Sequence, residues 1–382
     1  MEKIDKRLIT SVVASSIDEI ACFVFAENIE RAKDLFNKFE VKILAEYPFV
    51  NLLYVFGKLN TICRLSNHNV IKYISSQSNV EALVNISKQV LNLQTNSTLT
   101  GKNVGVCYID TGVHSHLDFC LGKNRIIKFV DLIEKRNQPY DDNGHGTFVC
   151  GVGSGSGLVS NFKFSGFAPQ SNIISIKALN CNGEATANKI LEAMQWVYSN
   201  HKQYDIKVVC MSFGSEPLGY NDPIMKGAEM LWKCGICVVA AAGNSGPSYE
   251  TIKSPGVSNK IITVGGINDN RFDDNNFNKN FFEVAKFSSR GPALKRFKPD
   301  LVAPSVDINS CLNSNKFYTK LSGTSVATPM VAGICALAFE KNKNLKPDNI
   351  KRALLQSCTP ITFNKNFEGF GLLNAGKFLS IV

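Results

Sequence analysis

The most informative segment of the sequence is LSGTSVATPMVAG, residues 321–333. It opens a run of small and apolar residues, 326–339, that is hydrophobic on every side and therefore predicts a buried helix. Gly323 and Thr324 supply a turn and a cap, so Ser325 is expected in the first helical turn. Backbone N–H groups are free there and the helix dipole is positive, which suits an oxyanion. The alternative is a capped core helix in which Ser325 bonds only to its own backbone.

The length and charge of the chain indicate how many domains to expect and which kinds of partner are not expected to bind. With 382 residues it exceeds a usual single domain, so one large and one smaller domain are expected. The formal net charge is +10, from 42 basic and 32 acidic residues, but lysine and arginine are scattered without a dense basic run. We interpret the excess as a solvated surface and expect no nucleic-acid partner.

The 12 cysteines lie at irregular spacing and mostly in apolar surroundings, as Cys22, Cys150 and Cys335 do. This pattern favours free thiols in a reducing compartment over a disulfide framework, which is typical of short secreted chains. Cys234 and Cys237 have the spacing of a redox pair or of half a zinc site. The sequence has no second pair with ligand spacing, so core packing is favoured.

The N-terminal segment shows no targeting signal. It carries charges on both sides of a short apolar run that serines interrupt, without a clear cleavage site. Nowhere in the sequence is there an uninterrupted apolar run of the length that spans a membrane. We therefore expect a cytoplasmic protein with no membrane partner, although non-classical export or packaging into a spore would leave no mark in the sequence.

An alternating unit of strands and helices precedes the main part of the chain. The first predicted helix places Ile29, Ala32, Leu35, Phe36 and Phe39 on one face. The β-α-β-β-α-β order predicts a small split-βαβ sandwich, which suits binding, chaperoning or regulation rather than chemistry. The predicted elements cover residues 19–26, 27–40, 41–48, 51–58, 60–66 and 70–76.

The domain boundary is expected between residues 81 and 85, because a polar segment there precedes a change of pattern at Val104. Beyond it, continuous apolar strands alternate with amphipathic helices, which implies a parallel sheet covered on both faces. Ligands of such sheets bind beyond the carboxyl ends of the strands. Asp110, Ser212 and Asn244 fall at those ends.

Three side chains form a candidate catalytic set with Ser325 as its nucleophile. A serine hydroxyl is a weak nucleophile until a base takes its proton, and the base works best when a third group fixes its tautomer. His145 is flanked by glycines before a run of small residues, and Asp110 closes a buried strand next to a glycine turn. Taken singly, Asp110 would be interpreted as a cap and His145 as a structural histidine.

Asn244 is a candidate oxyanion donor. It closes an apolar strand and precedes a Ser-Gly-Pro turn. A primary amide at a strand end can donate to a developing oxyanion, and such a donor is worth about 10²–10³ in turnover. The alternative is an asparagine in an ordinary turn.

Taken together, these segments resemble the subtilisin-like serine proteases, the subtilases. The motifs are DTG around Asp110, GHGT around His145, AAGNSGP around Asn244 and SGTSVATP around Ser325. Their chain order, Asp then His then Ser, is that of the family. The resemblance covers about residues 84–380, and more narrowly the chain is similar to intracellular members that carry a prodomain without a secretion signal.

The resemblance implies an α/β, subtilisin-like three-layer fold with a mostly parallel central sheet, preceded by a small α+β, ferredoxin-like prodomain. The chain would divide into a prodomain, residues 1–83, and a peptidase domain, residues 84–382. The prodomain would act as a foldase and temporary inhibitor of its own peptidase domain. Self-cleavage is then expected within residues 81–85, with Leu83 as the expected position.

The resemblance also implies hydrolysis of peptide bonds through an acyl-enzyme, with a polypeptide substrate and no cofactor for the chemistry. Ser325 would attack, and His145 would act as general base and then as acid. Asp110 would orient the imidazole, while Asn244 and the Ser325 N–H would hold the oxyanion.

The substrate-binding residues implied by the match form two walls of the primary specificity pocket and an edge that pairs with the substrate backbone as an added strand. Glu184 at that edge would favour a basic residue in the substrate. The walls are Ser212, Phe213, Gly214, Ala241, Ala242 and Gly243, and the edge is Gly183, Glu184 and Ala185.

Metal binding stays an open expectation. Asp118 matches a position that binds calcium in relatives, but the loop that completes that site in secreted subtilisins is not recognisable between Gly153 and Gly166. A structural calcium ion is therefore left unassigned. His114 and His116 resemble a metal pair, but we interpret both as surface loop residues.

Three positions depart from the family pattern. Phe148 stands where many members have a second histidine, Cys150 where they have alanine, and Ser305 where they have glycine. We expect the first two to alter the packing behind His145 and the third to change a turn.

Two rival functions remain. A non-catalytic member of the same fold would bind peptides or regulate a protease, but such relatives normally lack a triad residue, and this chain has all three. An α/β-hydrolase esterase is suggested by Gly323, Thr324 and Ser325. Those enzymes use G-x-S-x-G and the order Ser, Asp, His, whereas Ala327 replaces the second glycine here.

Overall fold

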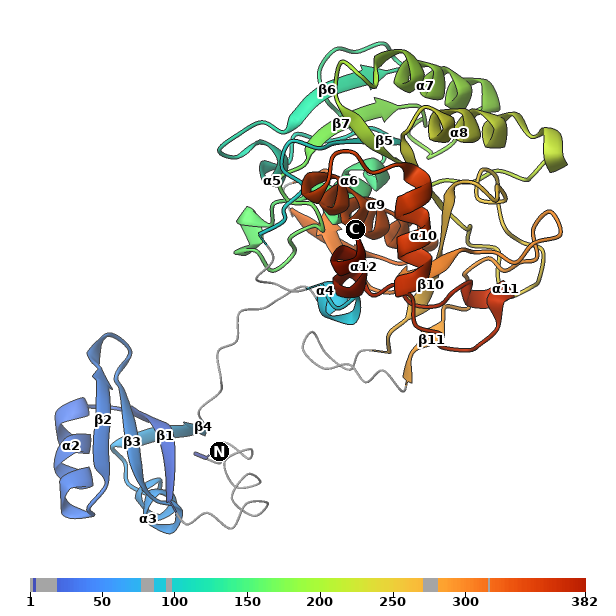
Figure 1. Ribbon diagram of the computed structural model, residues 1–382. Helices are drawn as coiled ribbons and strands as arrows, with labels where there is room; N and C mark the ends of the chain where they lie inside the picture. Colours follow the sequence, from blue (N-terminus) through green and yellow to red (C-terminus); the bar gives the residue numbers. More distant parts are fainter. Residues whose placement is uncertain (1–2, 5–18, 77–85, 94–97, 271–280, 315–316) are drawn as a thin grey trace. The chain divides into compact units, whose positions relative to one another are not determined.

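The computed structural model describes residues 3–4, 19–76, 86–93, 98–270, 281–314 and 317–382 (Figure 1). The chain divides into two compact units, residues 1–82 and 83–382. The predicted boundary after residue 83 and the predicted self-cleavage site at 81–85 lie outside the described residues.

The N-terminal unit is a four-stranded sheet with helices against one face. The strand order is β2-β3-β1-β4, and β1 is antiparallel to both of its neighbours. This is the predicted split-βαβ topology. Its elements are β1 (Glu19–Ala26), α2 (Ile29–Lys38), β2 (Lys42–Tyr47), η1 (Pro48–Val50), β3 (Leu52–Lys58), α3 (Leu59–Leu65) and β4 (Ile71–Ser76).

Alternation along β1 divides its side chains between the core and the open face of the sheet. Cys22 and Val24 are buried in the same core as Phe36 of α2, whereas Phe25 is 38% exposed. The prediction that Phe39 lies on the same helical face as Ile29, Ala32 and Phe36 is wrong. The helix ends at the preceding residue, so Phe39 leaves the helical spacing and is 47% exposed.

The larger unit contains a mostly parallel sheet. Among the described residues its strand order is β11-β10-β9-β8-β5-β7-β6, and β12 also pairs with β10. Only the short β11 is antiparallel to its neighbour. The strands are β5 (Gly105–Asp110), β6 (Ile126–Asp131), β7 (Asn172–Lys177), β8 (Ile206–Met211), β9 (Cys237–Ala241), β10 (Ile262–Asn268), β11 (Glu283–Val284) and β12 (Leu301–Pro304), beside a separate hairpin of β13 (Ile308–Cys311) and β14 (Tyr318–Leu321).

Helices cover both faces of this sheet, so the predicted three-layer α/β fold is confirmed (Figure 1). Helices α6 and α9 pack against each other, and α7 packs against α8. The helices of the larger unit are α4 (Ile86–Val90), α5 (Leu117–Cys120), α6 (His145–Ser154), α7 (Ala187–Asn200), α8 (Pro223–Lys233), α9 (Thr324–Lys341), α10 (Pro347–Ser357), α11 (Lys365–Glu368) and α12 (Ala375–Ile381), with short turns η2 (Leu158–Ser160) and η3 (Gly219–Asn221).

Helix α9 is the buried helix that residues 326–339 predict. Every residue of that run is buried, and the helix contacts β8, β9 and β10. Its start differs from the prediction by one residue. Gly323 is the N-cap and Thr324 is the first helical residue, so Thr324 does not cap the helix. Its hydroxyl is thereby left for another contact.

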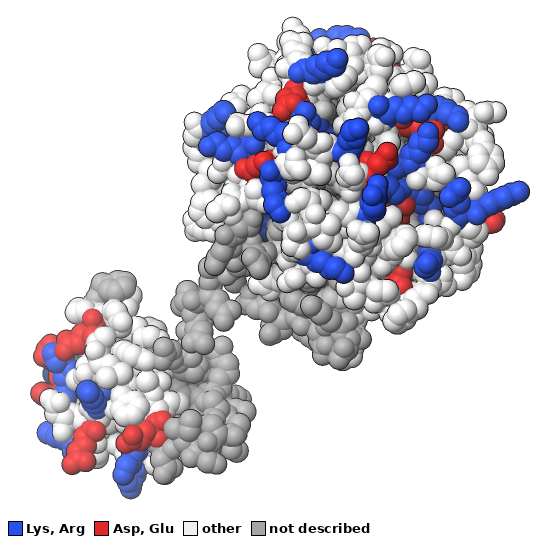
Figure 2. All heavy atoms as spheres, in the orientation of Figure 1, with Lys and Arg blue, Asp and Glu red and all other residues white. Residues whose placement is uncertain are grey.

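The cysteines are free and the charged side chains are scattered, as the composition predicts (Figure 2). All 12 cysteines, each within the described residues, are free. On the visible face of each unit, Lys and Arg side chains are interspersed with uncharged surface and with Asp and Glu (Figure 2). Within the described part of the chain, the helices are too short or too polar to cross a bilayer.

Candidate active site

Asp110 and His145 are in direct contact at the carboxyl edge of the central sheet. Strand β5 ends at Asp110 and helix α6 begins at His145. His145 Nδ1 lies 2.7 Å from Asp110 Oδ1. The Asp110 side chain is 1% exposed and the His145 side chain 28%, so solvent reaches the imidazole but not the acid.

The acid raises the proton affinity of the imidazole. Burial by itself lowers the pKa of His145, but the charge of Asp110, its hydrogen bond to the ring and the charge of Asp141 outweigh burial. The pKa of His145 therefore lies above its ordinary value. The Thr111 N–H donates to Asp110 Oδ1 at 2.8 Å and helps to hold the carboxylate in place.

Ser325 and Asn244 face one point beside Gly323. Asn244 Oδ1 accepts from the Thr324 N–H at 2.9 Å and from the Thr324 hydroxyl at 3.0 Å, which fixes the amide and leaves Nδ2 to donate. A methyl group on Gly323 would lie 3.1 Å from Ser325 Oγ and 3.2 Å from Asn244 Nδ2. Gly323 has a φ of 155°, so a glycine both allows this backbone and keeps the space open.

All four candidate side chains belong to the same edge of the sheet. Strands β5, β8 and β9 are parallel neighbours, so Asp110 and Asn244 both lie at carboxyl ends, where ligands of such sheets bind. His145 is hydrogen-bonded to Asp110, and Thr324 is hydrogen-bonded to Asn244. These hydrogen bonds bring the first turn of α6 and the first turn of α9 to this edge. Ser325 lies in the first turn of α9.

A buried carboxylate, Asp141, ties the acid segment to the imidazole segment, and the sequence analysis missed it. Its Oδ1 accepts from Thr111 Oγ1 at 2.9 Å and from Gly144 N at 2.8 Å. Its Oδ2 accepts from the N–H and the hydroxyl of Thr147, at 2.8 and 2.6 Å. Asp141 therefore fixes the backbone on both sides of His145. Its place in the turn-forming run DDNG was the signal that could have found it.

Lys177 is a second group that the sequence analysis missed. It ends β7 and is fully buried, where an ammonium is costly unless it is paired and hydrogen-bonded. Because it holds the residue after Asp110, it helps to position the acid. No sequence signal marks it, since a lysine at a strand end is normally solvated. Its Nζ donates to Thr111 O at 2.7 Å, Asp142 Oδ1 at 2.6 Å and Leu179 O at 3.1 Å.

The three departures from the family pattern are all buried. Phe148 and Cys150 are fully buried in α6, where both contribute packing. The Ser305 hydroxyl donates to the Ile267 carbonyl at 2.9 Å, and the Ser305 carbonyl accepts from the Gly323 N–H at 2.9 Å. Ser305 therefore holds the turn that precedes α9.

One cavity of about 420 Å³ gathers several of the predicted substrate-binding residues. Its other lining residues include apolar Leu179, Ile190 and Ile224, and the carboxylate of Glu216. The predicted residues on it are Gly183, Glu184, Ala185, Phe213 and Gly214.

The remaining four predicted wall residues are not among the residues that line this cavity. Ser212, Ala241 and Ala242 are buried at the ends of β8 and β9, with exposed fractions of 4%, 3% and 0%. Gly243 is half-buried and directly precedes exposed Asn244. The structure thus separates these four residues from the cavity that the other five share.

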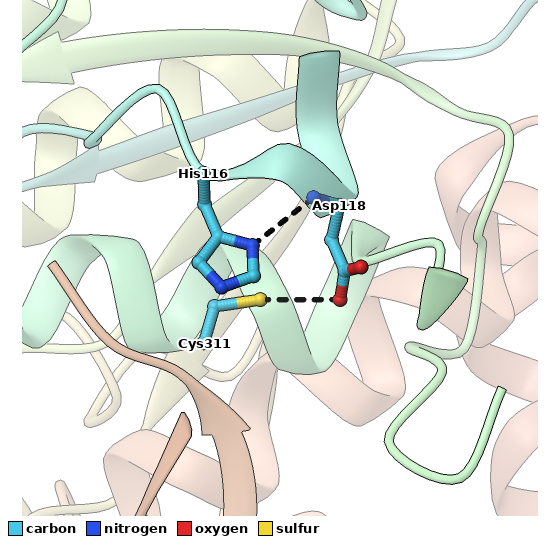
Figure 3. Close-up of side chains that lie close together, drawn as sticks. All are labelled: His116, Asp118 and Cys311. Carbon is cyan, nitrogen blue, oxygen red and sulfur yellow. Dashed lines mark hydrogen bonds between the residues drawn. The ribbon is translucent and has the colours of Figure 1, made fainter. Parts of the chain in front are cut away.

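A buried cluster of His116, Asp118 and Cys311 lies in the same unit (Figure 3). The interpretation of His116 as a surface residue is wrong, because the side chain is only 3% exposed. Phe317 and Tyr318, distant in sequence, pack their rings against the imidazole.

Hydrogen bonds within the protein occupy the polar atoms of this cluster. His116 Nδ1 accepts from the Asp118 N–H at 3.1 Å, and its Nε2 lies 2.9 Å from the Phe317 carbonyl. Asp118 Oδ2 accepts from the Tyr318 hydroxyl at 2.7 Å and from the Cys311 thiol at 3.6 Å. Burial lowers the pKa of His116, against the opposing charge of Asp118, and burial with that charge raises the pKa of Cys311.

The donor set does not fit a metal ion. Calcium takes about six to eight oxygen ligands, whereas the atoms around the single carboxylate of this cluster are N–H, O–H and S–H donors. Zinc would need a thiolate and an imidazole nitrogen with a lone pair to spare. Burial keeps Cys311 protonated and both nitrogens of His116 are engaged. Asp118 is thus held as a hydrogen-bond acceptor.

The edge that holds Asp110, His145, Asn244 and Ser325 is that of a serine hydrolase on a parallel α/β sheet. The family is given by the sequence. Residues 101–372 match the model of the subtilase family, and the chain belongs to that family.

The relatives agree with this membership. Serine protease AprX of Bacillus subtilis (strain 168) is 38% identical over 338 residues, which cover 81% of this chain and 75% of the relative. Subtilisin DY of Bacillus licheniformis is 33% identical over 277 residues, covering 72% and 90%. The crystal structure of a cold adapted subtilisin-like serine proteinase matches with a TM-score of 0.57 and 28% identity over 74% of this chain and 90% of the other. The protein is a serine-type endopeptidase that acts on polypeptides.

Proposed function

We propose that this endopeptidase hydrolyses peptide bonds through an acyl-enzyme on Ser325, with Asp110 and His145 as the other members of its triad. The observation that carries the proposal is the 2.7 Å contact between His145 Nδ1 and Asp110 Oδ1. The position of Asn244 Nδ2 beside Ser325 Oγ supports it further, because a hydrogen-bond donor is needed where the oxyanion forms.

In the proposed acylation each of these residues has a defined role. Ser325 Oγ attacks the carbonyl carbon while His145 Nε2 takes the hydroxyl proton. Asp110 holds the Nδ1 proton and stabilises the imidazolium that forms. Asn244 Nδ2 and the Ser325 N–H, which lies in the first turn of α9, donate to the oxyanion. His145 then gives its proton to the leaving amine.

The proposed deacylation repeats the proton transfers with water as the nucleophile. His145 Nε2 takes a proton from water as the water attacks the acyl carbon, and then returns it to Ser325 Oγ as the carboxylic acid leaves. No cofactor enters either half of the reaction, because the imidazole supplies and removes every proton.

The substrate is proposed to lie across the cavity that Gly183, Glu184 and Ala185 border, with its backbone paired to that edge as an added strand. Glu184 is exposed there, which supports a preference for a basic residue in the contacted part of the substrate. Matched peptides with Lys or Glu at that position test the preference, and equal cleavage rates would remove it.

The chain is also proposed to be made as a zymogen, with residues 1–83 as foldase and temporary inhibitor. The N-terminal unit has its own core. Its open sheet face is aromatic: Phe25 stands opposite Tyr73, and the rings of Phe23 and Tyr54 are 4.8 Å apart. Phe25 and Tyr73 are 38% and 39% exposed. An exposed apolar patch of this kind supports binding to another protein surface.

The intact mass of the purified protein tests the zymogen proposal. The wild type should lose the N-terminal unit by a cut within residues 81–85, with Leu83 as the expected position. Ser325→Ala should keep the unit, because the cut is made by the chain's own active site. Identical full-length masses for the two proteins would contradict self-processing.

A cytoplasmic location is proposed on the state of the thiols. All 12 cysteines are free and Cys181 is exposed, which suits a reducing compartment. Immunodetection after cell fractionation tests this. Recovery from the culture medium or from the spore coat would contradict it.

One experiment separates this function from its rivals. Labelling by a fluorophosphonate and cleavage of casein should both occur in the wild type and both be lost in Ser325→Ala. Labelling without peptide hydrolysis would favour an esterase. If the wild type shows neither labelling nor cleavage, a non-catalytic binding protein would be favoured.

A further inference from the structure

Lys253 fills the space between the ends of two neighbouring strands. Its N–H donates to the Ala242 carbonyl at 2.9 Å. A methyl group on Gly214, beyond β8, would lie 2.5 Å from Lys253 Cβ, and one on Gly243, beyond β9, would lie 2.6 Å from Lys253 Cγ. The stem of the lysine therefore occupies the room that these two glycines leave.

This position adjoins the oxyanion site. Gly243 directly precedes Asn244, whose Nδ2 lies beside Gly323, as Ser325 Oγ does. The inference rests on the proposed function and on the primary specificity pocket that the resemblance to subtilases implies, whose expected walls, residues 212–214 and 241–243, lie at the ends of β8 and β9. Lys253 lies between these two segments, so its ammonium is placed to meet that side chain.

The charge of Lys253 is available to a substrate at low cost. Its Nζ pairs with the carboxylate of Glu216. The Lys253 side chain is 18% exposed, but that of Glu216 is 81% exposed. An ion pair with so exposed a member contributes little to stability, because solvent screens it. A substrate carboxylate can therefore replace Glu216 beside the largely buried lysine.

We propose that Lys253 selects substrates with an acidic residue, Asp or Glu, immediately before the scissile bond. Attraction between an ammonium and a carboxylate is stronger in a partly desolvated pocket than in water. The same charge repels Lys and Arg, so it discriminates by repulsion as well. Glu216 is the resting partner of Lys253 when no acidic side chain is bound.

Matched peptides that differ only in the residue before the scissile bond test this specificity. For the wild type, kcat/KM with Glu is expected to exceed kcat/KM with Gln by about tenfold, and Lys should be the poorest residue. Glu and Gln have nearly the same shape, so their ratio reports charge rather than size. The ratio should fall as ionic strength rises, because salt screens the attraction.

Variants of Lys253 and Glu216 test whether this ion pair causes the preference for Glu over Gln. Lys253→Met removes the charge and keeps most of the stem, so the Glu-to-Gln ratio should fall to about one. Lys253→Arg should keep the preference for Glu. Glu216→Gln removes the competing carboxylate and should raise the ratio. Lys260→Met, at an exposed lysine in the following loop, is the matched control and should leave the ratio unchanged.

The outcomes separate this proposal from the proposed function. A wild-type ratio near one, or a ratio that Lys253→Met leaves unchanged, would overturn the role of Lys253. Failure of the proposed function would instead appear as no cleavage of any peptide, or as cleavage that persists in Ser325→Ala. Should Lys253→Met not fold, Glu216→Gln decides, and an unchanged ratio in that variant contradicts the proposal.

Discussion

The larger unit contains two histidines that each lie beside an aspartate, and they differ in which atoms meet. In the first pair, His145 Nδ1 meets the carboxylate of Asp110, and the ring is 28% exposed. In the second pair, His116 Nδ1 accepts from the backbone N–H of Asp118, and the residue is 3% exposed. The pKa is raised in His145 and lowered in His116.

Proximity of an imidazole and an acid therefore does not by itself make the imidazole a base. A carboxylate that accepts from the ring stabilises the protonated imidazole, so His145 can take a proton during a reaction. Both ring nitrogens of His116 are hydrogen-bonded to the backbone, and the side chain is buried away from solvent. Catalysis therefore needs the carboxylate contact together with exposure of the opposite nitrogen.

The largest effect is expected from His145→Ala. Without its base, Ser325 keeps its proton, and kcat/KM should fall by about 10⁵–10⁶. Steady-state cleavage of a chromogenic peptide measures this, on protein shown by thermal unfolding to be folded. His116→Ala is the contrasting variant, and a comparable loss of kcat/KM in folded His116→Ala would contradict the assignment of His145 as the base.

Asp110→Asn should have the next largest effect. The amide preserves the shape but favours the wrong tautomer of His145, so kcat should fall by about 10⁴. The same change removes the charge that raises the pKa of His145, so the acid limb of the remaining activity should move to lower pH. A pH profile of kcat/KM measures both, and a limb that moves upward would contradict the assigned contact.

Asn244→Ala should lower activity less than the two preceding variants. Loss of one oxyanion donor is expected to lower kcat by about 10²–10³ with little change in KM, because the bond forms in the transition state. Peptide kinetics measure the two constants. An increase in KM with kcat unchanged would place Asn244 in ground-state binding instead.

The pH profile of the wild type reports the protonation of His145 without a mutation. His145 acts as a base only when neutral, so kcat/KM should fall as the pH drops through its pKa. Since Asp110 and Asp141 raise that pKa, the midpoint of the acid limb should lie above 6.5. A midpoint below that value would mean that burial outweighs the two acids.

Asp118→Asn should have the smallest effect on catalysis and a clear effect on stability. The amide cannot satisfy all the donors that the carboxylate accepts from, so the free energy of unfolding should fall by about 1–3 kcal/mol. Differential scanning calorimetry would show the change as a lower Tm. Per folded molecule, kcat/KM should stay within about twofold of the wild type. A loss beyond that would give the cluster a part in the chemistry.

Much of this site could be predicted from local sequence. Apolar strands ending at Asp110 and before Asn244, and the apolar run after Ser325, define which residues reach the carboxyl edge of a parallel sheet. The structure has these strand ends and this helix. The prediction succeeds because strand ends and helix starts depend on neighbouring residues.

Features that depend on distant segments could not be predicted. His116 is buried because Phe317 and Tyr318 pack on it, and no local pattern links them. Lys177 is buried because its three oxygen partners come from three segments, which follow β5, precede α6 and follow β7. Lys253 is placed between two strand ends that lie far from each other in the chain.

In the proposed mechanism, the contact between Asp110 and His145 activates Ser325. Intact mass after reaction with a fluorophosphonate, followed by peptide mapping, measures this activation at the serine itself. We expect one adduct per molecule, on Ser325, formed readily by the wild type and far more slowly by Asp110→Asn and His145→Ala. An adduct on another residue, or equal rates of labelling in all three proteins, would contradict it.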